Sequence, residues 1–213
     1  MAKEGREHHD NLSGPPERRL QARLPLSEEY LRAHTIGEVK ALSGPVRLEE
    51  YDPEWPRRFR REDAKIRAAL AQRALRIEHV GSTSVPGLMA KPLIDILLVV
   101  ADSSAEAEYV AALENAGYKL HIRESEWYEH RMLKGPENDV NLHVFSAGCA
   151  EIERMLVFRD RLRSNQADRE LYARTKKMLA QQEWKYTQNY ADAKTAVIEE
   201  ILARAGWSRG AAV

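Results

Sequence analysis

The chain has 213 residues, the length of one ordinary domain with a short appendage. Its 33 basic and 33 acidic side chains cancel, so there is no overall field to attract nucleic acid or an anionic membrane, and any anion site must be local. The single cysteine, Cys149, excludes an internal disulfide framework and is typical of a reducing compartment. No apolar run reaches the roughly 18 residues of a membrane span, and residues 1–26 lack the apolar segment of a secretory signal. We therefore expect a cytoplasmic protein with neither a nucleic-acid nor a membrane partner.

Residues 1–44 are expected to form a tail and an accessory arm. Residues 1–26 are rich in charge and proline, which favours a tail. Ser27 is a suitable N-cap, and the acids Glu28 and Glu29 follow it where the helix dipole favours them. A short helix is therefore expected between Ser27 and Leu42.

The main body is expected to begin at residue 45. A short strand is predicted over residues 46–50, and Pro56 lies where a helix can begin. Trp55, Phe59 and Ile66 then fall near one helical face, which predicts a helix over residues 55–70.

Strands and one helix fill the middle of the chain. The apolar run PLIDILLVV is typical of a strand buried on both faces, and Asp95 is the only acid in it. Ser103 or Ser104 is expected to cap a helix over residues 105–116, which Gly117 ends. The other strands are predicted over residues 74–81, 118–123, 128–135 and 140–145.

The last third has helical periodicity. Apolar spacing predicts helices over residues 152–162, 171–179 and 186–205, with Asp168 as the cap of the second. The predicted fold class is α+β or α/β, a sheet flanked by helices and closed by a C-terminal helical layer. Residues 45–149 would form the core, and residues 150–213 would pack on it within one domain.

A Gly-Ser loop follows the strand over residues 74–81. Gly81 lets the backbone approach a ligand closely, and the hydroxyls of Ser82, Thr83 and Ser84 can donate to phosphate oxygens. Asp95 follows on the next strand, and a carboxylate beside a phosphate is a natural ligand for Mg²⁺. The alternative is an ordinary turn followed by a core strand with a hydrogen-bonded aspartate.

Polar side chains also alternate along the strand over residues 140–145. Asn141 and His143 share one face. If this strand lies beside that of Asp95, both side chains face the same cleft, with His143 as metal ligand, general base or phosphate partner. A purely structural histidine is the alternative.

These residues together resemble the GrpB family, which is similar to the nucleotidyltransferase superfamily. The resemblance covers roughly residues 45–205, and its most specific block is GSTSVPGLMAKPLIDI. It implies a nucleotidyltransferase-like mixed sheet in which Gly81 and Ser82 bind phosphates and two acids hold Mg²⁺. Asp95 matches the first acid, Leu97 replaces the second, and His143 occupies the position of a third.

Several basic positions complete the expected phosphate site. Lys91 lies four residues before Asp95 and can act as a point charge on a phosphate. The resemblance adds four positions to it, namely Arg131, Lys176, Tyr190 and Lys194. For each basic residue alone, a solvated surface charge is the alternative.

Two functions are compatible with this set. The first is Mg²⁺-dependent transfer of a nucleotidyl group from a nucleoside triphosphate to an acceptor, with Asp95 and His143 as catalytic residues and Asp95, Asn141 and His143 as metal ligands. The second is a non-catalytic module that binds a nucleotide or a CoA-related molecule, which Leu97 favours. Both imply a nucleotide or another phosphorylated small molecule as partner.

Overall fold

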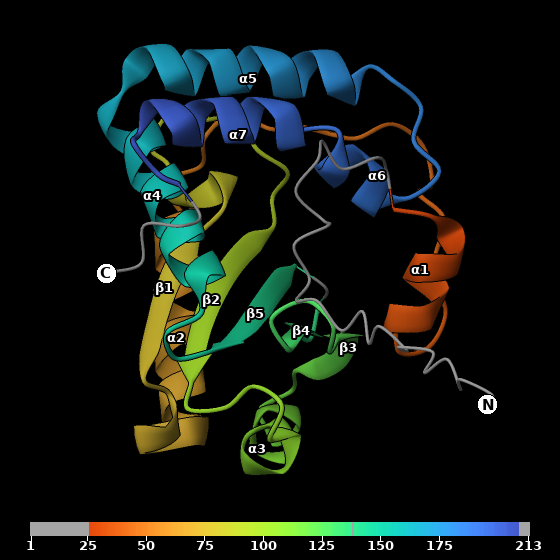
Figure 1. The fold of residues 1–213 in the computed structure, drawn as a ribbon, viewed down its shortest axis with the longest axis vertical. Helices are drawn as coiled ribbons and strands as arrows, with labels where there is room; N and C mark the ends of the chain where they lie inside the picture. The colour runs from red at the N-terminus through yellow and green to blue at the C-terminus, as the bar shows by residue number, and fades with distance from the viewer. Residues whose placement is uncertain (1–25, 138, 209–213) are drawn as a thin grey trace, which may run out of the picture.

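The computed structural model describes residues 26–137 and 139–208. At its centre lies a five-stranded mixed sheet with the strand order β1-β2-β5-β4-β3 (Figure 1). β2 and β5 are parallel, and the other neighbouring strands are antiparallel. The predicted mixed sheet with flanking helices is confirmed. The strands are β1 (Arg76–Val80), β2 (Ile94–Val100), β3 (Lys119–Glu124), β4 (His130–Lys134) and β5 (Val140–Ser146).

Helices cover both faces of the sheet. α2 and α3 pack on one face, and α4 packs on the other. α5 and α7 lie side by side across one end of the sheet, while α1 lies beside β3 (Figure 1). The helices are α1 (Glu28–His34), α2 (Trp55–Leu70), α3 (Val110–Asn115), α4 (Ala150–Ser164), α5 (Gln166–Ala180), α6 (Thr187–Asp192) and α7 (Thr195–Arg204), with 3-10 turns at Ala71–Arg73, Ser82–Ser84 and Glu106–Glu108.

Alternation along β2 divides the core into two layers. Ile94, Ile96 and Leu98 pack with the apolar face of α2, whereas Leu97 and Val99 pack beneath α4. Both sets are buried, which accounts for the continuous apolar run in the sequence. None of the described helices combines the length and apolar character that a bilayer crossing requires.

The C-terminal helices share a core with the Gly-Ser loop region. Val85 and Leu88, just after this loop, pack with Tyr172 of α5 and Ile201 of α7. This contact holds α5 and α7 over the loop and so decides which of their side chains face it.

The N-terminal arm differs from its predicted form. Of the tail expected over residues 1–26, all but Leu26 lies outside the described residues. Ser27 caps α1 as predicted, but the helix ends at His34 because the chain turns to pair Thr35 with Ile122 of β3. The strand expected over residues 46–50 is reduced to one bridge, between Glu49 and Ala90.

Three predicted helix boundaries are also wrong. Residues 105–116 form a 3-10 turn followed by the short α3, and Asp102 rather than a serine accepts the hydrogen bond from the Ser104 amide. Asn165 caps α5, which leaves Asp168 to form ion pairs with Arg161 and Arg204. The helix expected over residues 186–205 is broken into α6 and α7.

Candidate functional site

The parallel pairing of β2 with β5 brings together the polar residues predicted for the site. Asp95 lies opposite Asn141, and Leu97 lies opposite His143. Asn141 Nδ2 donates a hydrogen bond of 2.8 Å to Asp95 Oδ1, and His143 Nε2 lies 3.8 Å from the same oxygen. Asp95, Asn141 and His143 therefore form one polar group on the face of the sheet that α4 covers only in part.

Gly81 lies directly against the carboxylate of Asp95. Its φ angle is +67°, in the left-handed region that glycine adopts readily. A Cβ atom added to Gly81 would collide with Asp95 Oδ2 and would lie 2.9 Å from Asp95 Cβ. The glycine is therefore required both by the turn and by the close approach of the loop to Asp95.

Four lysines surround Asp95, and we call them the lysine cluster. They come from four different segments: the loop before β2, the end of β4, α5, and the junction of α6 with α7. The charge of Asp95 acts on all four, which are Lys91, Lys134, Lys176 and Lys194. The site thus sets four lysine side chains against one carboxylate, an arrangement that suits an anionic ligand.

Hydrogen bonds and aromatic rings hold the lysine cluster in place. Lys134 Nζ donates to Asn141 Oδ1 at 2.5 Å. Lys176 Nζ donates to the carbonyl of Met89 and lies 5.0 Å from the centre of the Tyr172 ring. Lys194 Nζ lies 4.6 Å from the centre of the Tyr190 ring. Such cation–π contacts attract an ammonium group to the face of the ring.

Burial and mutual repulsion weaken the charged form of these lysines. Burial lowers the pKa of all four, and repulsion from Lys194 lowers it further at Lys91 and Lys176, while the Asp95 carboxylate opposes the effect. The pKa of Lys176 falls to about 7. A bound anion would favour protonation of Lys176, because it would supply the negative charge that the site lacks.

Asp95 remains an anion despite its surroundings. Burial alone would raise its pKa, but the nearby His143 imidazole, the hydrogen bond from Asn141 and the Lys194 ammonium bring the pKa below its usual value. Asp95 is therefore ionised at neutral pH and can accept hydrogen bonds.

The two tyrosines beside Lys176 and Lys194 carry buried hydroxyl groups. Burial raises the pKa of Tyr172 to about 12, and a hydrogen bond with Ser82 opposes the shift. Tyr190 Oη is buried and has no hydrogen-bond partner among the described residues. An unpaired buried hydroxyl is costly, so Tyr190 is a donor that a ligand could satisfy.

Thr83 and Ser84 were predicted to bind phosphate, and the structure uses their hydroxyls inside the loop instead. Thr83 Oγ1 donates to the carbonyl of Leu93 and lies 3.1 Å from His79 Nε2. Ser84 Oγ donates to the carbonyl of Gly81 at 2.6 Å. These bonds shape the loop and leave Ser82, which is hydrogen-bonded to Tyr172, as the hydroxyl of this loop that is not used within it.

Arg131 was also expected at the phosphate site, but it lies on the other face of the sheet. On β4 it pairs with Val144, whereas the neighbouring Met132 pairs with His143 on the site face. Its side chain is buried and forms ion pairs with Glu106 and Glu129. The period of two in a strand excludes it from the lysine cluster.

Residues missed in the sequence extend the site. Lys134 of β4 joins it because that strand pairs with β5. Tyr172 precedes Lys176 by four residues, the same spacing as Tyr190 and Lys194, so this signal was present in the sequence. His130 was missed because its place beside His143 depends on the pairing of β4 with β5, which the sequence does not show.

His130 lies behind His143 in a chain of polar contacts. Glu124 Oε2 lies 2.8 Å from His130 Nδ1, and His130 Nε2 lies 3.1 Å from His143 Nδ1. This contact fixes the orientation of the His143 ring, whose other nitrogen faces Asp95.

Comparison with known proteins assigns the family. The family model described as GrpB protein matches residues 45–204. The chain belongs to the GrpB family. The predicted membership is thus confirmed, and the match spans the whole sheet and the four C-terminal helices of this GrpB protein.

Relatives of this GrpB protein occur in several bacteria. A UPF0157 protein of Halalkalibacterium halodurans is 55% identical over 191 residues, which cover 90% of this chain and 98% of that protein. The crystal structure of conserved protein GrpB from Enterococcus faecalis is 34% identical with a TM-score of 0.67, covering 75% of this chain and 96% of that one. A dephospho-CoA kinase of Mycolicibacterium paratuberculosis is 38% identical over 113 residues, which cover 51% of this chain and 28% of the kinase.

The site of this GrpB protein does not fit a magnesium ion held by the protein. Leu97, at the position of a second acid, is fully buried in the apolar cluster beneath α4. The amide oxygen of Asn141 is occupied by Lys134, which leaves Asp95 and the His143 imidazole as donors. The described residues contain no group of three or more His, Cys, Asp or Glu side chains that could hold a metal ion. The positive charge of the lysine cluster around Asp95 also opposes a dication.

Proposed function

We propose that this GrpB protein binds a phosphorylated small molecule of the nucleotide class, with its phosphate chain in the lysine cluster. The observation that carries the proposal is the convergence of Lys91, Lys134, Lys176 and Lys194 on Asp95. In this arrangement the ammonium groups neutralise the phosphates, a task that Mg²⁺ often performs elsewhere. The similarity to a dephospho-CoA kinase supports a ligand with an adenine nucleotide portion.

The loop and the tyrosines would complete the binding site. Ser82 and the adjacent backbone amides can donate to phosphate oxygens, and Gly81 allows them to approach because it carries no side chain. Tyr190 Oη has no partner among the described residues and offers a further donor.

Calorimetric titration of the purified chain tests this proposal. Tripolyphosphate, ATP, dephospho-CoA and adenosine serve as probes, and we expect the three phosphorylated compounds to bind and adenosine to bind much more weakly. Lys176→Gln and Lys194→Gln should each weaken binding by about tenfold or more, because each removes a charge-assisted contact. Lys177→Gln is the matched control, since Lys177 neighbours Lys176 on α5 but is exposed. Equal affinity in all three variants would contradict the proposal.

Nucleotidyl transfer is the second candidate. It is favoured by the grouping of Gly81, Ser82, Asp95 and His143 in one site. In this reaction an acceptor hydroxyl attacks the α-phosphorus of a nucleoside triphosphate and pyrophosphate leaves, with His143 placed to take the proton.

Pyrophosphate release separates the two candidates. Each nucleoside triphosphate would be incubated with the protein and a pool of metabolites, with and without Mg²⁺. Release that is lost in Asp95→Asn supports transfer. Nucleotide binding without pyrophosphate release under any condition identifies a binding module instead.

A further inference from the structure

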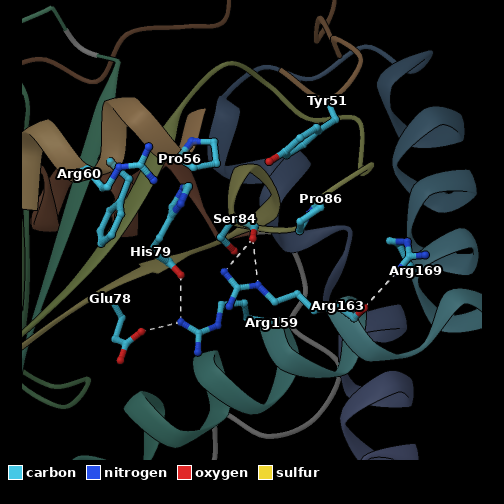
Figure 2. Close-up of a pocket in the computed structure, with 11 residues that line it drawn as sticks. Tyr51, Pro56, Arg60, Glu78, His79, Ser84, Pro86, Arg159, Arg163 and Arg169 are labelled. Atoms are coloured by element: carbon cyan, nitrogen blue, oxygen red, sulfur yellow. Dashed lines mark hydrogen bonds and ion pairs between the residues drawn. The ribbon is translucent and has the colours of Figure 1, made fainter. Parts of the chain in front are cut away.

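A pocket lies beside the Gly-Ser loop, and none of the four lysines of the lysine cluster lines it. Its volume is about 590 Å³, within the range of small-molecule sites. It is lined by residues of α2, β1, the loop after β1, α4 and α5, and we call it the arginine pocket. Figure 2 shows four arginines around it, namely Arg60, Arg159, Arg163 and Arg169.

Only part of this positive charge is balanced by protein groups. Arg159 pairs with Glu78 at 2.8 Å and with Asp160 at 2.7 Å. Among the described residues, Glu78 is the only acid that lines the pocket. His79 adds no charge at neutral pH, because burial lowers its pKa to about 4.

The remaining arginines keep donors for a ligand. Arg163 donates chiefly to the carbonyl of Ser84, at 3.0 and 2.8 Å, and only reaches Asp160 at 3.5 Å. Arg169 Nη1 donates to the carbonyls of Leu162 and Arg163, which leaves its Nε and Nη2 without a partner among the described residues. Arg60 has no hydrogen bond or ion pair within the described part of the chain.

The charged form of Arg163 is destabilised by its surroundings in the pocket. Burial and repulsion from Arg159 lower the pKa of its guanidinium. An anion in the pocket would relieve that repulsion.

The wall that faces Arg159 and Arg163 is largely apolar. It includes Tyr51, Pro56 and Pro86 (Figure 2), and Phe59 also lines the pocket. The Phe59 ring stacks on the His79 ring, with 4.8 Å between the ring centres. A ligand would therefore set an apolar or planar portion against the wall and its anion against the arginines.

We infer that the arginine pocket is a second ligand site, for a small molecule that carries a phosphate monoester on a planar ring. A phosphate offers three acceptor oxygens and a charge near −2, which suits the spare N–H groups of Arg169, at the Arg163 end of the pocket (Figure 2), better than a single carboxylate does. Guanidinium forks bind phosphate oxygens in pairs. This site is separate from the lysine cluster and does not depend on the function proposed there.

Phenyl phosphate is a suitable probe, with inorganic phosphate and phenol as its two halves. In calorimetric titrations of the full chain we expect phenyl phosphate to bind about tenfold or more tightly than either half. The variant Arg169→Ala should weaken its binding by about tenfold or more. The matched control is Arg174→Ala, which removes an exposed arginine from the same helix, and it should bind as the wild type does.

The lysine cluster provides the test of location. Lys194→Gln weakens binding at the lysine cluster but should leave one phenyl phosphate site of wild-type affinity, because Lys194 does not line the arginine pocket. Loss of that site in Lys194→Gln, or wild-type binding in Arg169→Ala, overturns the assignment. So does phenyl phosphate binding no more tightly than inorganic phosphate.

Discussion

The backbone of Gly81 touches the carboxylate of Asp95, with no room for a side chain between them. The end of β1 and the start of β2 are neighbours in the sheet, since Val80 pairs with Asp95. The turn after β1 therefore passes directly over the acid. The positions of the Gly-Ser loop and of the Asp95 side chain therefore depend on each other, and we expect a substitution in one to displace the other.

Gly81→Ala should lower both stability and ligand affinity. Its Cβ would collide with Asp95 and the residue would keep a positive φ angle, so we expect a loss of about 3 kcal/mol in the free energy of unfolding. Gly87→Ala is the control, because φ there is +75° but an added Cβ meets nothing within 4 Å. It should cost about 1 kcal/mol. Urea unfolding measures the free energy of unfolding of the two variants. Equal losses of stability in Gly81→Ala and Gly87→Ala would show that the contact with Asp95 is unimportant.

Binding of a polyphosphate should take up a proton at Lys176. The pKa of this lysine is about 7 in the free protein, and a bound anion raises it. At pH 8 the free lysine is mostly neutral, so binding should take up close to one proton, and affinity should fall as the pH rises above 7. Titration calorimetry with tripolyphosphate in buffers of different ionisation enthalpy measures this uptake. Lys176→Met should abolish it and Lys177→Met should not, whereas an uptake unchanged in Lys176→Met would contradict the assignment.

Restoring an acid at position 97 should not restore a metal site. Leu97 is fully buried among Val80, Phe145 and the apolar face of α4. Leu97→Asp would bury a charge without a partner and should cost roughly 4 kcal/mol. Leu97→Met conserves volume and should cost less than about 1.5 kcal/mol. Urea unfolding tests the stabilities, and Mg²⁺ titration of Leu97→Asp should show no binding. A stable variant that binds Mg²⁺ would reopen the metal-dependent mechanism.

Acid should destabilise the protein through His130. Burial, opposed by the Glu124 carboxylate, lowers the pKa of His130 to about 4 in the folded chain, whereas the unfolded value is about 6.5. Above pH 7 the imidazole is neutral in both states and contributes nothing. As the pH falls from 6.5 to 4 the unfolded chain binds the proton first, so up to about 3 kcal/mol of stability is lost.

In His130→Gln, the number of protons taken up on unfolding between pH 6.5 and pH 4 should fall by close to one, so stability should depend less on pH. Urea unfolding between pH 4 and pH 7.5 measures the slope. The pKa of His79 is also lowered by burial, to about 4, so His79→Gln should reduce the pH dependence of stability in the same way. Stability should depend less on pH in the double variant than in either single variant. An unchanged slope in His130→Gln would contradict the proposed contribution.

The central part of the site could be predicted from the sequence because strand periodicity carries the information. Alternation placed Asn141 and His143 on one face, and the apolar run marked β2 as an interior strand. Only the pairing of β2 with β5 was an assumption, and the structure confirms it. Helices α2, α4 and α5 were likewise recognised, because apolar residues recur with helical spacing over three turns or more.

Other features depend on contacts that no local pattern encodes. Lys134 and Arg131 are both basic residues of β4, and only the register against β5 decides which of them reaches Asp95. The hydroxyls of Thr83 and Ser84 appeared free in the sequence because their acceptors are main-chain carbonyls. Asn165 and Asp168 are both good caps, and the ion pairs of Asp168 with Arg161 and Arg204 decided between them.

Ser84 of the Gly-Ser loop links the arginine pocket to the loop that lies against Asp95. Its carbonyl accepts both hydrogen bonds from Arg163 on the side of the arginine pocket, while its hydroxyl donates to Gly81, which lies against Asp95. A ligand that draws Arg163 away from Ser84 therefore acts on the wall of the lysine cluster. Thermodynamic linkage makes this effect reciprocal. If a ligand in the arginine pocket changes the affinity of the lysine cluster for its ligand by some factor, the ligand of the lysine cluster changes the affinity of the arginine pocket by the same factor.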